Sequence, residues 1–197
     1  GRFLQNELAR RLGIDLHLLD LNGAEGPAGL SPHGAIDAIS AHWRSNRAEP
    51  LILIGSSFGG WAAARYAELH PTRVSRLLLL NPGFNLADRW EHIVGGAAQL
   101  EEWKMRGWRT FTMPSSGEPI DVPWSFVQAT RESGGTPTVG VPGTVIHGLS
   151  DEVVPYSLSE SFVAKHCEAP SKLVLLEDDH ALTAPASLSR IADEAAA

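Results

Sequence analysis

Apolar residues along the chain recur with two different periods. Apolar positions at 3, 4, 8 and 12 have helical spacing, so we predict a helix over residues 3–12. Residues 14–21 alternate between apolar and polar side chains and lead into an Asn-Gly turn signal at 22–23, which predicts a strand. A Ser-Pro pair then begins a predicted helix over residues 31–43, because proline is favoured in a first helical turn.

The same alternation of strand and helix patterns continues downstream. Residues 50–54 and 74–80 are short apolar runs, as expected of parallel strands buried on both faces, and an alanine-rich helix is predicted between them. Later segments predict a strand at 144–146, a helix near 155–165, a strand at 172–176 and a helix from about Pro185. This order predicts an α/β fold, a three-layer α/β/α sandwich with a mostly parallel sheet.

Residues 84–140 do not follow this alternation. They hold four of the six tryptophans, and their helical patches are interrupted by prolines at 114, 119 and 123. We therefore expect a helical cap inserted over residues 84–140 within one domain that spans residues 1–197.

Composition narrows the possible partners. A net charge of −7 disfavours binding to a phosphate backbone, so no nucleic acid is expected. No apolar run is long enough to span a membrane. Cys167, the single cysteine, cannot form an internal disulfide, which favours a cytoplasmic protein with a buried, unreactive thiol. The oligomeric state stays open.

The candidate chemistry begins at Gly55-Ser56-Ser57-Phe58-Gly59-Gly60, between a predicted strand and a predicted helix. This segment contains Gly-x-Ser-x-Gly centred on Ser57, the pattern of a nucleophile on a tight strand-to-helix turn. We expect glycines at 55 and 59 because larger residues there would crowd the turn. Ser56 is the rival hydroxyl, but only Ser57 has glycines at both the −2 and the +2 position. Dinucleotide-binding and P-loop patterns are absent.

In this segment the chain resembles small single-domain esterases of the α/β-hydrolase superfamily, in which the nucleophile, the acid and the histidine follow one another along the chain. The resemblance implies that Asp151 is the acid, because residues 147–155 read His-Gly-x-x-Asp-x-x-Val-Pro. Glu152 is an alternative acid, and Asp151 could instead only cap the next helix. His180, after the last predicted strand, would be the general base.

The resemblance also implies an oxyanion hole made of two backbone N–H groups. Phe58 N–H would be one donor. The other normally comes from a loop after a strand ending in His-Gly, and this sequence contains no such strand before its first predicted helix. We therefore expect an N-terminally truncated chain with exposed strand edges.

These residues predict a serine hydrolase acting on carboxylic esters of small or medium apolar molecules, with no cofactor and no metal. The aromatic residues of the cap either line an apolar pocket or pack the cap onto the sheet: Trp90, Trp103, Trp108, Trp124, Phe111 and Phe126. Thioester cleavage or acyl transfer on the same fold is the first alternative. A non-catalytic binding protein is the second.

Overall fold

A computed structural model describes residues 2–22, 29–46, 49–112 and 117–197. Within them, four parallel strands form one sheet in the order β1-β2-β5-β6. The strands are β1 (Leu51–Ser56), β2 (Val74–Leu80), β5 (Gly143–Gly148) and β6 (Ser171–Leu176). All four lie where the apolar runs predict them. The expected turn at 22–23 and the break at Pro114 involve residues outside the described part of the chain.

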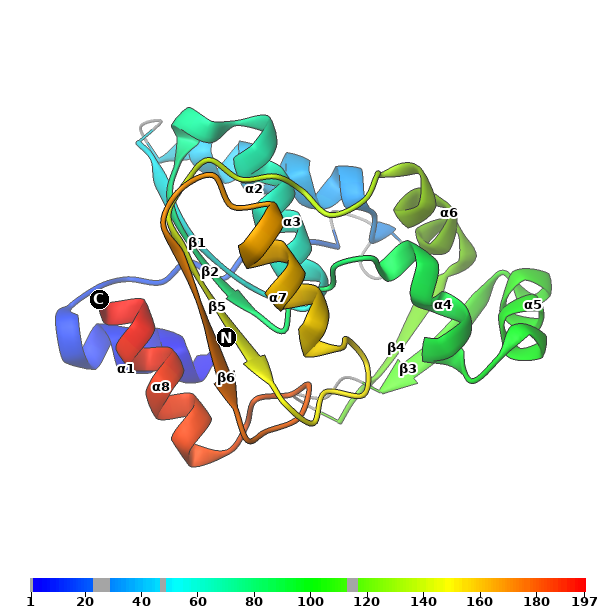
Figure 1. Ribbon diagram of the computed structural model, residues 1–197. Helices are drawn as coiled ribbons and strands as arrows, with labels where there is room; N and C mark the ends of the chain where they lie inside the picture. The colour runs from blue at the N-terminus through cyan, green and yellow to red at the C-terminus, as the bar shows by residue number, and fades with distance from the viewer. Residues whose placement is uncertain (1, 23–28, 47–48, 113–116) are drawn as a thin grey trace.

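Helices cover both faces of this sheet (Figure 1). One face carries α2 (Pro32–Ser45), α3 (Phe58–Leu69) and α7 (Tyr156–Lys165), and the other carries α1 (Arg2–Leu12) and α8 (Pro185–Ala196). A 3₁₀ turn over Pro71–Arg73 precedes β2. The predicted three-layer α/β/α sandwich is confirmed. None of the helices in the described ranges has the length and apolar character needed to cross a bilayer.

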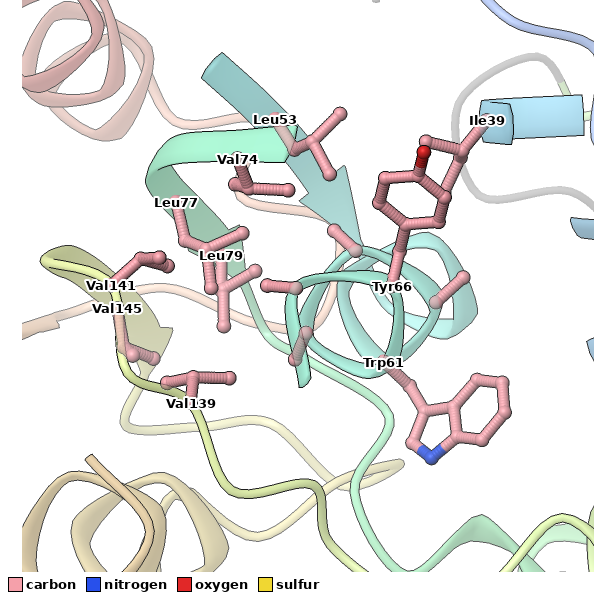
Figure 2. Packing of buried hydrophobic residues seen from close by; sticks show 14 of the residues in the cluster. Ile39, Leu53, Trp61, Tyr66, Val74, Leu77, Leu79, Val139, Val141 and Val145 are labelled. Carbon is pink, nitrogen blue, oxygen red and sulfur yellow. The ribbon is translucent and has the colours of Figure 1, made fainter. Parts of the chain in front are cut away.

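Alternation along the strands divides the core between the two faces. In β2, Leu77 and Leu79 face the α3 side and Leu78 faces the α1 and α8 side, because successive strand residues point in opposite directions. Figure 2 shows the α3 side, where apolar side chains of β2 and residues such as Val145 of β5 lie along one side of the helix. This cluster holds α3 against the sheet, which fixes the turn at the N-terminus of the helix.

The predicted strand over residues 14–21 is wrong, since this segment forms no ladder. Its apolar residues pack instead at the edge of the sheet: Leu16 joins the cluster on the α1 side, and Leu21 joins the cluster on the α3 side. Ladder hydrogen bonds require a neighbouring strand. In the described ranges the sheet ends at β1, and residues 14–21 pair neither with β1 nor with any other strand. Ile52 of β1 is accordingly 58% exposed, which corrects the expectation that β1 is buried on both faces.

The segment after β2 holds helices, as expected of the inserted cap, and in addition an antiparallel hairpin that the sequence did not predict. It contains α4 (Leu86–Val94), α5 (Ala97–Arg106), α6 (Trp124–Glu132) and an antiparallel hairpin of β3 (Trp108–Thr112) and β4 (Pro119–Pro123). These elements gather on the right of Figure 1 and enclose a third apolar cluster. Phe58, the first residue of α3, packs against this cluster and so connects it to the strand-to-helix turn.

Candidate active site

Ser57 occupies the turn between β1 and α3 in a backbone conformation that few side-chain-bearing residues adopt, with φ 51° and ψ −121°. Its N–H donates to the Leu80 carbonyl at 2.9 Å. Its own carbonyl accepts from the N–H groups of Gly60 at 2.9 Å and Gly83 at 2.8 Å. Bonds to β2 and to the loop after it therefore hold the turn in this conformation.

Crowding requires glycine at two positions around the turn, and only one of them is a position expected from the sequence. A Cβ on Gly55 would lie 2.3 Å from the Gly59 carbonyl oxygen, and one on Gly60 would lie 3.0 Å from Pro82 Cα. A Cβ on Gly59 would meet only a Leu21 methyl, at the ordinary distance of 3.7 Å. Crowding thus explains Gly55 as predicted, but it falls on Gly60 rather than on Gly59.

Three side chains that are far apart in sequence meet above this turn. Ser57 Oγ lies 3.0 Å from Nε2 of His180. Nδ1 of the same imidazole lies 2.6 Å from Oδ2 of Asp151. The rival residues Ser56 and Glu152 are exposed to solvent. A hydroxyl, an imidazole and a carboxylate in this series form the geometry by which a histidine accepts a serine proton.

Asp151 is held ionised in a fully buried position. Burial opposes its charge, but hydrogen bonds from His147, His180 and the Val154 N–H outweigh that effect and keep the pKa of the carboxyl well below its usual range. Its Oδ1 accepts from the N–H groups of Val153 and Val154, both at 2.8 Å. Asp151 therefore does not cap the next helix, whose N-cap is Pro155; it bonds the loop before that helix and contacts the imidazole of His180.

His147, from the His-Gly pair of the motif, supports the same carboxylate. The ring is fully buried, and its Nε2–H faces the Val154 carbonyl at 2.9 Å and Asp151 Oδ2 at 3.3 Å. Its Nδ1 lies 2.7 Å from Ser159 Oγ. From the sequence, His147 only marked the position of the acid; in the structure it contacts that acid directly.

Phe58 lies at the first position of α3, where a backbone N–H has no intrahelical partner. Its ring stacks on Trp61 with centroids 5.7 Å apart and meets Phe126 edge-on at 4.9 Å. The N-terminus of α3 can stabilise negative charge beside Ser57 through this N–H and the helix dipole.

The four tryptophans proposed to bind substrate lie in different environments. Trp90 and Trp103 are buried, and their indole N–H groups bond Thr130 Oγ1 at 2.8 Å and the Val122 carbonyl at 3.0 Å. Trp124 packs edge-on against Trp103. Trp108 is 42% exposed, with Arg106 over its ring. For Trp90 and Trp103 this is the packing alternative that the sequence left open.

A hollow of about 170 Å³ lies between α3 and the inserted segment. It is lined by Phe58, Trp61, Asn85, Leu86, Ala87, Asp88, Thr130, Arg131, Gly134 and Gly135. Of these residues, only Phe58 was expected at the site from the sequence. They come from three separate segments, and no local pattern marks them.

The described residues were also considered as metal ligands, and Cys167 as a second nucleophile. Among the described residues, no group of three or more His, Cys, Asp or Glu side chains is arranged to hold a metal ion. Cys167 is half-buried, and burial raises the pKa of its thiol, so that little reactive thiolate forms at neutral pH.

Comparison with known proteins agrees with this architecture. A sequence model described as the alpha/beta hydrolase fold matches residues 44–121, which include Ser57. A crystal structure from Agrobacterium vitis S4, assigned as a hydrolase, superimposes with a TM-score of 0.75 at 24% identity, over 96% of this chain and 78% of that one. The chain therefore has the α/β-hydrolase fold.

Two further matches have a lower TM-score or cover less of the matched protein. Est1E from Butyrivibrio proteoclasticus superimposes with a TM-score of 0.64 at 16% identity, over all of this chain and 81% of Est1E. The curated mouse protein named palmitoyl-protein thioesterase ABHD10, mitochondrial, is 28% identical over 147 residues, 71% of this chain. The chain spans about half of that relative, 48% of its length.

Proposed function

We propose that this α/β-hydrolase cleaves carboxylic esters of small or medium apolar molecules, with Ser57 as the nucleophile. The hydrogen-bonded series from Ser57 through His180 to Asp151 is the observation that carries the proposal. It supplies a hydroxyl, a base to remove its proton and a carboxylate to orient the base. The proposal needs no cofactor and no metal. We also predict a cytoplasmic location, as expected from the single cysteine.

The reaction follows from these contacts. As His180 Nε2 takes the Ser57 proton, Oγ attacks the ester carbonyl carbon, and the carbonyl oxygen becomes an oxyanion beside the Phe58 N–H. The protonated imidazole, stabilised by Asp151, then gives its proton to the departing alcohol, and an acyl-serine remains. Water activated by the same imidazole cleaves the acyl-serine and restores the hydroxyl.

The hollow beside Phe58 is the proposed position for the apolar part of the substrate. It adjoins the residue whose N–H faces the oxyanion, and apolar rings form part of its wall. Trp108 and Trp124 remain candidates for contact with larger substrates. Trp90 and Trp103 would act by holding the shape of the wall.

A fluorophosphonate probe tests the nucleophile directly. Wild type and Ser56→Ala should be labelled, and Ser57→Ala should not be labelled and should lose ester turnover by at least about 10³-fold. Ser56→Ala is the matched control because it removes the adjacent hydroxyl. Labelling that persists in Ser57→Ala would reject the assignment. A wild-type chain with neither labelling nor turnover would favour the non-catalytic binding protein.

Thioester cleavage is the second candidate, supported by the name of the mouse relative. An ester and a thioester of the same acyl group distinguish the two, since the acyl-serine is identical and only the leaving group differs. A kcat/KM that is higher for the ester supports the first proposal. A large preference for the thioester supports the second.

A further inference from the structure

Asn81 follows the last residue of β2 and is fully buried at the carboxyl edge of the sheet. Its φ of 42° lies in the left-handed region, which asparagine tolerates better than most residues. Its backbone N–H donates to the Ile146 carbonyl of β5 at 2.9 Å. The sheet therefore holds the backbone of Asn81 in place, and the Asn81 side chain lies at the carboxyl edge of the sheet.

The Asn81 amide joins two loops that each carry one of the proposed catalytic side chains. Its Oδ1 accepts from the Gly148 N–H, at the end of β5, at 2.8 Å. Its Nδ2 donates to the carbonyls of Asp179 at 3.1 Å and His180 at 2.9 Å. The partners fix the orientation of the amide, because a flipped group would set its NH₂ against an N–H and its oxygen against two carbonyls.

The loop that carries His180 already holds its own shape. Asp178 accepts from the Ala184 N–H at 3.0 Å, and Asp179 accepts from the Ala181 N–H at 2.8 Å. This loop also passes so close to Gly148 that a Cβ there would lie 2.5 Å from the Asp178 carbonyl oxygen. A compact loop thus packs on the end of β5, and Asn81 connects residues 179 and 180 of this loop to the sheet.

We propose that Asn81 is a positioning residue that sets the place of the His180 imidazole between Ser57 and Asp151. The inference rests on the proposed function of His180 as the base. Asn81 bonds the backbone of His180 and has no bond to the reacting hydroxyl. The imidazole must satisfy contacts of 3.0 Å and 2.6 Å at its two nitrogens, so a small displacement of the loop breaks one of them.

Asn81→Asp is the sharpest variant. The carboxylate keeps the shape and the acceptor for Gly148 N–H, but it loses both donors and faces two carbonyl oxygens. Asn81→Gly removes the whole side chain while permitting the left-handed backbone, so it is the second variant. Ile39→Ala, in the core beneath α3, serves as a control for lost stability away from the site.

Two measurements test the proposal. In ester hydrolysis, Asn81→Asp and Asn81→Gly should lower kcat by about 10- to 100-fold with KM nearly unchanged, because the substrate hollow is untouched. In proton NMR, the deshielded Nδ1–H signal of His180, assigned by its absence in His180→Gln, should shift or disappear in both variants. Ile39→Ala should keep both properties.

Folded Asn81 variants with wild-type kcat and an unchanged imidazole signal would overturn the proposal. A lower kcat with that signal unchanged would also overturn it, since the effect would not pass through His180. The NMR experiment needs no substrate. If the wild-type chain proved inactive, the proposed function would fail while the signal still decided whether Asn81 positions His180.

Discussion

His147 lies 3.3 Å from the same oxygen of Asp151 that accepts the hydrogen bond of His180. Two imidazoles and two backbone N–H groups therefore surround one buried carboxylate. The backbone pair engages one oxygen and the imidazole pair the other. Because the two oxygens of Asp151 have different partners, the orientation of an asparagine amide at position 151 can be predicted.

Asp151→Asn should reduce ester turnover by about 10⁴-fold while the fold is retained. The asparagine oxygen will stay with the two backbone N–H groups, so its NH₂ will face His180 Nδ1. The imidazole proton must then move to Nε2, where it points at Ser57 and prevents proton removal. Steady-state kinetics measures the loss. Glu152→Gln, which neutralises the adjacent exposed carboxylate, should retain activity, and an equal loss in both variants would contradict the role of Asp151.

The buried carboxylate also predicts acid sensitivity. Because the pKa of Asp151 is lower in the folded chain than in the unfolded chain, its ionisation stabilises the fold above the ordinary aspartate pKa. That contribution is lost as pH falls through the lower folded value. Urea unfolding of wild type and Asp151→Asn should therefore give a free-energy difference that shrinks below about pH 4. A difference constant from pH 5 to 3 would show that the carboxyl is not perturbed.

Ser57→Gly should be inactive but more stable than Ser57→Ala by about 1 kcal/mol. Both variants remove the hydroxyl, and only glycine relieves the strained backbone at φ 51°. Thermal and urea unfolding measure the comparison. Equal stabilities of the two variants would mean that the backbone conformation at position 57 does not lower the free energy of unfolding.

The two glycines after Phe58 should respond differently to alanine. Gly60→Ala should destabilise the chain by about 1–3 kcal/mol, because its Cβ would press on the backbone of Pro82. Gly59→Ala should change the unfolding free energy by less than about 1 kcal/mol, since its Cβ has room and alanine favours the helix. The reverse order would contradict the packing of the turn against the loop after β2.

Ala87→Phe should shift the substrate range toward short acyl chains. Ala87 lines the hollow beside Phe58, so a phenyl ring there would occupy the space proposed for a longer chain. The kcat/KM for a long-chain ester should fall by about tenfold or more, with little change for an acetyl ester. Ala98→Phe, on the exposed face of α5, is the matched control. Equal loss for both esters would place the acyl chain elsewhere.

Local chemistry in the sequence was sufficient for the strands of the main sheet and for the candidate nucleophile. A strained turn demands its own glycine pattern, so Gly55 and Ser57 are recognisable without coordinates. Apolar runs bounded by turn residues located β1, β2, β5 and β6. The resemblance to the α/β-hydrolase superfamily then pointed to Asp151 and His180.

Only the tertiary structure decided the features that depend on neighbours distant along the chain. Residues 14–21 alternate like a strand, but a strand exists only where another can pair with it. Trp90 and Trp103 look like pocket residues until their indole N–H groups are seen to be bonded inside the inserted segment. Asn81 resembles an ordinary turn residue after a strand. Its three amide bonds arise because parallel strands bring their carboxyl ends to one edge, which no stretch of sequence records.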